Sequence, residues 1–191
     1  MYFKKMIGPK CYLSPIDEND AEKFTEWLND LEVTQYLPGL YSGVINVRKE
    51  KELLEKISKE HNYSIIDLNT DELLGNCGFH YVDHINQTCE VGIFIGNKNF
   101  WNKGYGTEAL SLLLDYGFNA LNFHNISLRV VSYNERAIRS YEKLGFKIIG
   151  RKRESVSKDK ERHDMILMDI LNQEFNKNTL KKRNAPRANS I

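Results

Sequence analysis

The sequence predicts an α+β fold, in which a single domain combines a mixed β-sheet of about seven strands with flanking helices. The 191 residues suit one domain with its own core and are too few for two comfortable ones. Segments with strand-like alternation occur beside segments whose apolar residues have helical spacing. In the second half, helical segments separate consecutive strands, which favours parallel pairing there.

The first third of the chain predicts one strand followed by two helices. Residues 10–16, "KCYLSPI", have the character of an opening strand. In residues 17–31, aspartate and asparagine residues that can cap a helix precede an amphipathic pattern. The apolar residues of this pattern have i, i+3, i+4, i+7 spacing: Phe24, Trp27, Leu28 and Leu31. After the break "YLPGLYSG" at 36–43, residues 47–61 predict a second helix with a charged outer face.

Strand patterns dominate the middle of the chain, and helices alternate with strands towards its end. Residues 63–68 and 73–83 flank the turn "NTDE" and predict a hairpin, and residues 88–96 predict a further strand. The later elements are expected to be a helix at 107–121, a strand at 126–131, a helix at 134–145, and strands at 146–154 and 164–171. Gly145 is expected to end the last helix in a left-handed conformation.

Composition favours a protein of the cytoplasm. No segment approaches the roughly 18 consecutive apolar residues of a membrane span. The N-terminal lysines are not followed by the apolar core of a secretory signal. Cys11, Cys77 and Cys89 form an odd set without C-x-x-C spacing, which argues against a disulfide framework or a zinc site and for a reducing compartment.

Residues 1–175 are expected to form the domain, and residues 176–191 a basic, disordered tail. The tail has five basic residues and no acid, so the chain's net charge of +1 leaves −4 for the body. A polar tail of this kind is usually solvated, and an arm that contacts nucleic acid is the alternative. The acidic body gives nucleic acid no electrostatic footprint.

The stretch "WNKGYGTEAL" (101–110) indicates an anion site at the start of a helix. A helix N-terminus presents unpaired N–H groups and the positive end of its dipole, and glycines let a phosphate approach closely. A dinucleotide fingerprint fails because the glycines do not directly follow a strand and no acid lies about 20 residues further on. A P-loop fails because its G-K-[ST] ending is absent. A purely structural turn, with Thr107 as the helix cap, is the remaining alternative.

A second motif, "YNERAIRSYEKLGF" (133–146), places Asn134 at a helix start and Tyr141 near the end of that helix. Together with "EVGIFIG" (90–96) and the glycine loop, it resembles the GCN5-related N-acetyltransferase (GNAT) superfamily. The branch it is most similar to contains ribosomal-protein N-terminal acetyltransferases and spermidine acetyltransferases. The resemblance implies a sheet whose central parallel strands splay apart around acetyl-CoA as the cosubstrate, and it implies no metal.

The resemblance also implies roles for individual residues. The backbone of Phe94 and Ile95 would pair with the pantetheine arm as an added strand would. A loop would hold the pyrophosphate, formed by Asn102, Lys103, Gly104, Tyr105, Gly106 and Thr107. Asn134 would contact the cofactor beside the thioester, and Ala137 would line the same site. Tyr141 would donate a proton to the departing thiolate.

Glu90 is the candidate general base, acting through a water molecule. Strand alternation places it on the face opposite Cys89 and Val91, where a carboxylate beside a cleft could have a raised pKa. A solvated strand residue is the alternative for Glu90. The corresponding structural alternatives are a core position for Tyr141 and a helix cap for Asn134.

The expected acceptor is a primary amine, either a peptide N-terminus or a small amine, with a polyamine or an aminosugar as the alternative. Residues 36–47, which are expected to shape the acceptor mouth, carry no acid, and this disfavours a polycation. His163 and Asp164 open the last strand and are candidates for the acceptor pocket. His80 and His84 lie in a strand pattern, which disfavours a metal site.

A non-catalytic acyl-CoA sensor is the rival function from a different class. The presence of both Glu90 and Tyr141 argues against it. The expected partners are therefore acetyl-CoA and the acceptor amine, without nucleic acid or membrane. A homodimer is compatible with the sequence.

Overall fold

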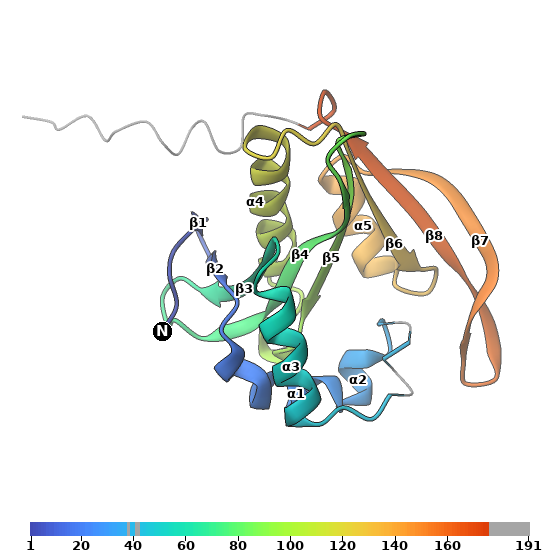
Figure 1. The fold of residues 1–191 in the computed structure, drawn as a ribbon. Helices are drawn as coiled ribbons and strands as arrows, with labels where there is room; N and C mark the ends of the chain where they lie inside the picture. Colours follow the sequence, from blue (N-terminus) through green and yellow to red (C-terminus); the bar gives the residue numbers. More distant parts are fainter. Residues whose placement is uncertain (38, 41–42, 176–191) are drawn as a thin grey trace, which may run out of the picture.

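The computed structural model describes residues 1–37, 39–40 and 43–175, and these form one mixed sheet of eight strands (Figure 1). The strands are β1 (Met6–Ile7), β2 (Cys11–Pro15), β3 (Asn62–Asp67), β4 (Leu73–Asp83), β5 (Thr88–Ile95), β6 (Asn125–Val131), β7 (Lys147–Lys158) and β8 (Glu161–Leu171). Their order across the sheet is β1-β2-β3-β4-β5-β6-β8-β7. The predicted mixed sheet is confirmed. The additional strand is β1, which pairs antiparallel with β2.

The helices group on the two faces of the sheet. They are α1 (Ala21–Leu28), α2 (Leu31–Thr34), α3 (Val47–Ile57), α4 (Tyr105–Asn119) and α5 (Glu135–Lys143), with short 3₁₀ turns η1 (Glu18–Asp20) and η2 (Lys98–Phe100). Figure 1 shows α1, α2 and α3 together, apart from α4 and α5. The single helix predicted over 17–31 is divided, because the Asp30 side chain accepts a hydrogen bond from the Glu32 N–H and starts α2 as a new helix.

Two apolar clusters hold these layers together. The larger cluster joins one face of the sheet to α4, whose Leu110, Leu113 and Leu114 are buried, and α5 packs its apolar side against it. The smaller cluster joins the other face to α1 and α3, with Phe24 and Leu54 at its centre. Burial of this apolar surface is the main stabilising contribution to the fold.

The second half of the sheet differs from the sequence prediction in one respect. Strands β5 and β6 are parallel neighbours, as predicted, but β8 lies between β6 and β7 and is antiparallel to both. The reason is a two-residue turn, Asp159–Lys160, in which both residues have positive φ (52° and 67°). Such a turn closes a tight hairpin, so β8 folds back along β7. Strand β8, whose Ile166, Met168 and Ile170 are buried, takes the place beside β6, and the largely exposed β7 stays at the edge.

Two further predictions concern the chain ends and the turns. Gly145 has the predicted positive φ, at 102°. The tail predicted at 176–191 lies outside the described residues. Within the described part of the chain, the longest helices are too short or too polar to cross a bilayer.

Candidate active site

The site begins where β5 and β6 separate. Their pairing covers Thr88, Cys89 and Glu90 on β5 and residues 125–127 on β6, although both strands continue beyond it. A parallel pair that stops partway leaves backbone N–H and C=O groups directed into the gap. This is the splay that the family resemblance implies.

The register of β5 against β4 decides which backbone groups face the gap. Gly96 donates its N–H to the Leu74 carbonyl, and the antiparallel register continues through Phe94 opposite Asn76. Phe94 therefore directs its backbone to β4, where a Cβ on Gly75 would collide with the Phe94 carbonyl oxygen. Alternate residues face the gap, and the Trp101 Nε1–H donates to the Ile95 carbonyl over 2.7 Å. Of the two backbones predicted to meet the pantetheine arm, Ile95 faces the gap and Phe94 does not.

The gap opens into a cleft of about 510 Å³ bordered by α2, the loop before α4, the start of α4, and α5. Eleven of the twelve predicted site residues line it: Glu90, Phe94, Ile95, Asn102, Gly104, Tyr105, Gly106, Thr107, Asn134, Ala137 and Tyr141. The twelfth, Lys103, does not line the cleft. Its ammonium lies over the Phe100 ring at 5.8 Å, and its carbonyl accepts a hydrogen bond from Lys10 Nζ.

Helix α4 enters the cleft without a side-chain cap. Gly104 is the N-cap residue, in a left-handed conformation with φ of 84°, and the helix begins at Tyr105, two residues earlier than predicted. Thr107 therefore lies in the first turn and does not cap the helix. The first helical hydrogen bond runs from the Glu108 N–H to the Gly104 carbonyl. The N–H groups before Glu108 remain available to an anion at the positive end of the helix dipole.

The start of α4 is fixed by polar contacts between distant residues that sequence reasoning did not identify. The Tyr105 hydroxyl donates to Asp67 Oδ2 over 2.8 Å, so this side chain anchors the loop to β3. Burial raises the pKa of Asp67, but hydrogen bonds from Tyr105, Asn69 and Thr70 outweigh that effect and lower it. The Glu108 carboxylate accepts hydrogen bonds from backbone N–H groups at the start of β2. The loop is thus held rigidly in one position.

Helix α5 supplies Asn134 and Tyr141 from its two ends. The Asn134 side chain accepts from the Ala137 N–H over 3.2 Å, so it does cap the helix while lining the cleft. Tyr141 borders the cleft with its ring against Phe146, and burial raises the pKa of Tyr141 to about 12. The phenol is consequently protonated at any physiological pH and is a hydrogen-bond donor.

Glu90 forms an ion pair that the sequence did not predict. Its Oε1 accepts from Nε and Nη2 of Arg129 on β6, at 2.9 and 2.8 Å. The carboxylate in turn raises the pKa of Arg129. In this arrangement one oxygen of the Glu90 carboxylate is engaged by two hydrogen bonds from Arg129, so Glu90 is not the free carboxylate that the strand pattern suggested.

The cleft is cationic overall. Its basic side chains are Arg129, Arg136, Arg139 and Lys143. Among the described residues Glu90 is the only acid that lines it. The sequence could have revealed three of these cations, because positions 136, 139 and 143 lie on one side of α5. This is the helix that also carries Tyr141. Arg129 could be found only from the pairing of β6 with β5.

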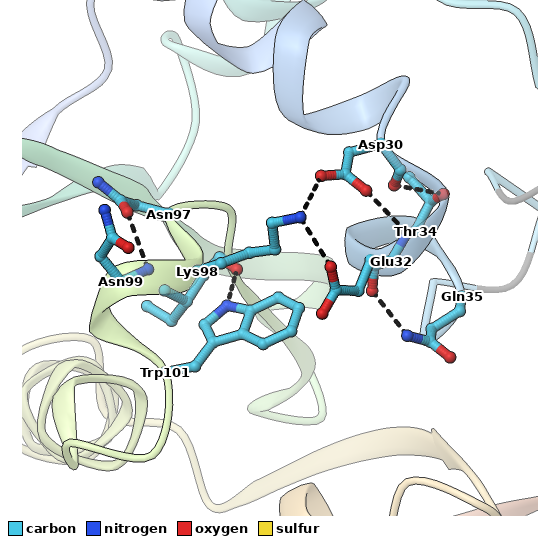
Figure 2. Close-up of polar contacts among 9 residues, drawn as sticks. Asp30, Glu32, Thr34, Gln35, Asn97, Lys98, Asn99 and Trp101 are labelled. Atoms are coloured by element: carbon cyan, nitrogen blue, oxygen red, sulfur yellow. Dashed lines mark hydrogen bonds and ion pairs between the residues drawn. The ribbon is translucent and has the colours of Figure 1, made fainter.

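Two acids at the start of α2, the cap residue Asp30 and Glu32, lie next to Val33 of the cleft lining and share one lysine. Figure 2 shows Lys98 between Asp30 and Glu32, with Nζ at 2.8 and 2.7 Å from their carboxylates. The hydrogen bonds that Lys98 donates, first to Asp30 and then to Glu32, raise the pKa of Lys98 to about 12. The same view shows the Trp101 indole beside this cluster, with its Nε1–H directed to the backbone of β5.

The remaining candidate residues of the sequence, His163 with Asp164 and His80 with His84, have different surroundings. The His163 ring meets the Tyr133 ring edge to face, with the centroids 4.7 Å apart, and the Tyr133 hydroxyl donates to the Gln35 carbonyl beside α2. Asp164 pairs with Arg151 at 3.0 Å on the adjacent strand. Neither residue predicted for the acceptor pocket lines the cleft itself. His80 and His84 belong to no metal-binding cluster within the ranges that the structure describes.

Comparisons with known proteins identify the protein family by sequence and the fold by structure. The family described as "Acetyltransferase (GNAT) domain" matches residues 10–147. The uncharacterized N-acetyltransferase p20 of Bacillus licheniformis is 30% identical over 167 residues, which is 85% of this chain and 93% of the relative. A GNAT acetyltransferase structure from Bacillus anthracis is 26% identical, with a TM-score of 0.77 over 91% of this chain and all of that one.

A further structural neighbour is the spermidine N-acetyltransferase of Vibrio cholerae in complex with CoA and spermine. It has a TM-score of 0.79 and covers 87% of this chain and 98% of that one. Its sequence identity is 23%, so this likeness is one of fold.

Proposed function

Because this chain belongs to the GNAT family of acetyl-CoA-dependent N-acetyltransferases, we propose that it acetylates a primary amine carrying few positive charges, by direct attack in a ternary complex. A peptide N-terminus or a small amine fits this description. The observation that carries the proposal is the cleft itself, in which an uncapped helix start, a strand gap and a protonated tyrosine border one space.

Each part of the cleft suits one part of acetyl-CoA. The free N–H groups at the start of α4 would accept oxygens of the pyrophosphate. The backbone of Ile95 and its alternate neighbours would pair with the amides of the pantetheine arm. Tyr141 would meet the sulfur, and Asn134 would lie next to the thioester. No charged side chain is needed at the glycine loop for this arrangement.

The reaction then requires the nitrogen to attack the thioester carbonyl carbon. A carbon–nitrogen bond forms, the carbon–sulfur bond breaks, and the thiolate leaves. The nitrogen loses one proton, and the sulfur takes up one from solvent or from a donor. Backbone N–H groups in the gap can stabilise the charge that develops on the carbonyl oxygen, and the Tyr141 hydroxyl can stabilise the thiolate.

The class of acceptor amine is inferred from the state of Glu90, the candidate base, and from the charges that line the cleft. Because Arg129 already engages Glu90, the described lining offers no unpaired carboxylate to deprotonate an amine with a pKa near 10.4, whereas a peptide α-amino group near 7.7–8.0 needs little help. The described lining of the cleft has four cations and one paired acid, and Lys98 offsets one of the two negative charges at the start of α2. A polyamine would therefore meet net repulsion.

The proposal is tested by mixing the protein with acetyl-CoA and a panel of amines, and by following the release of free thiol. The panel contains an acetylation-competent tripeptide, an aminosugar and spermidine. We expect kcat/KM for the tripeptide to exceed that for spermidine by at least about tenfold, or ~1.4 kcal/mol. In the Lys98→Met variant, which frees Asp30 and Glu32, spermidine use should rise while use of the tripeptide stays unchanged. Spermidine as the best acceptor of the wild-type protein would overturn the proposal.

A further inference from the structure

Arg136 occupies a junction between three elements of the cleft. Its Cζ lies 4.8 Å from the Trp101 ring centroid and 5.7 Å from that of Tyr36. Its Nη1 lies 3.5 Å from Oδ1 of Asn102, in the loop that leads to Gly104. A single exposed guanidinium from α5 thus reaches the segment after α2 and the loop before α4.

No carboxylate neutralises this cation. In the described part of the chain no acid lies within ion-pair distance of Arg136, whereas Arg129 pairs with Glu90 and Arg139 pairs with Glu135. Its contacts are ring faces and an amide oxygen, which orient a guanidinium without cancelling its charge. An oriented, unpaired guanidinium beside an uncapped helix start is well suited to a dianionic ligand.

Arginine has a geometric advantage for such a ligand. Its planar fork donates two parallel hydrogen bonds to a phosphate, and its planar face can remain stacked on an aromatic ring. The lysine that the sequence suggested for this role, Lys103, is turned over Phe100 and does not line the cleft. The charge for a phosphate therefore comes from α5.

We propose, on the basis of the function proposed above, that Arg136 binds a phosphate of acetyl-CoA, and that Trp101 and Tyr36 hold its guanidinium ready for that contact. The preference for phosphorylated over phosphate-free pantetheine compounds would then depend on Arg136. Because Tyr36 belongs to the segment after α2, cofactor affinity would also depend on that segment.

The test compares ligands with and without phosphate. Calorimetry measures CoA binding, and ligand-observed NMR measures pantetheine binding, for the wild-type protein and for Arg136→Met, Arg136→Lys and Tyr36→Leu. We expect Arg136→Met to weaken CoA binding by about tenfold or more, as for loss of hydrogen bonds to a charged group. Pantetheine binding should be unchanged. Arg136→Lys should restore part of the loss, and Tyr36→Leu should weaken CoA binding less than Arg136→Met.

Arg48→Met is the control for removal of a positive charge, because Arg48 lies on α3, away from the cleft, in an exposed pair with Glu52. It should leave both affinities unchanged. If Arg136→Met binds CoA as tightly as the wild type, or loses CoA and pantetheine to the same extent, the role of Arg136 is refuted. If the wild-type protein itself binds no CoA, the proposed function fails instead.

Discussion

Replacing Tyr141 with phenylalanine should lower kcat by about 100-fold and leave CoA affinity almost unchanged. The substitution removes one hydroxyl and keeps the ring that packs against Phe146. Within the described residues, this hydroxyl makes no hydrogen bond to the protein, so its loss leaves no buried group unsatisfied. The unfolding temperature should therefore stay the same or rise slightly.

The magnitude follows from the pKa of the phenol. Burial raises the pKa of Tyr141 to about 12, whereas a thiol such as that of CoA is near 8.5. Complete proton transfer from the phenol to the thiolate would be uphill by about 3.5 pKa units, or roughly 5 kcal/mol. Tyr141 is therefore better suited to donate a hydrogen bond to the departing sulfur than to surrender its proton. A hydrogen bond to a charged group contributes about 1.5–3 kcal/mol, which is roughly 10- to 150-fold in rate.

The assay is single-turnover release of thiol from pre-bound acetyl-CoA at saturating acceptor, with CoA affinity measured separately by calorimetry. The same hydrogen bond predicts that kcat for the wild type shows no titration of Tyr141 below about pH 10, because the phenol stays protonated. An unchanged kcat in Tyr141→Phe would remove Tyr141 from the mechanism. A loss of CoA affinity as large as the loss of kcat would make it a binding residue instead.

Two other substitutions separate stability from function. Gly106 lies in the first turn of α4, where an added Cβ would sit 3.7 Å from Ile95 Cγ1. Gly106→Ala should therefore raise the unfolding temperature, because alanine has the higher helix propensity by up to about 1 kcal/mol, and should lower CoA affinity about tenfold. Unchanged CoA affinity by calorimetry would contradict the assignment of the phosphate to this helix start. Asp67→Asn should flatten the acid limb of the stability curve. Because the pKa of Asp67 is lowered in the folded protein, its ionised form contributes stability that is fully present above the unfolded-state pKa near 3.9 and is lost as the pH falls through the folded-state pKa. The free energy of unfolding, measured with urea between pH 5 and 2, should therefore fall more steeply for the wild type than for the variant. Parallel curves would contradict this role.

Sequence patterns predicted the elements whose signals are local. The cap of α5 by Asn134, the left-handed Gly145 and the alternation of β5 depend on residues close in sequence, and the structure contains each of them. The start of α4 was misplaced by two residues because a glycine with positive φ replaces the side-chain cap that the pattern favoured. The position of β8 was missed because it depends on the turn at 159–160, whose residues are not the usual glycine or asparagine.

Pairings between distant residues account for most of what the sequence could not provide. Arg129 meets Glu90 only because β6 is registered beside β5, and Tyr105 meets Asp67 only because the fold brings the start of α4 beside the end of β3. Both contacts change the chemistry of a residue already selected from its pattern. Glu90 becomes a paired carboxylate, and Tyr105 becomes an anchor that contributes only its backbone to the proposed phosphate site.

The strength of the Lys98 pairs decides how far the cleft can exclude a polycation. As free carboxylates, Asp30 and Glu32 would favour a polyamine near Val33 and Tyr36 of the cleft lining. Lys98 cancels part of that attraction, but its side chain is 42% exposed, and exposed pairs of this kind contribute only about 0–1 kcal/mol each. A polyamine could therefore displace the lysine at small cost. The lasting barrier must come from the cleft interior, where Glu90, the one acid of its described lining, is already paired with Arg129 and leaves no free carboxylate for the second ammonium of the acceptor.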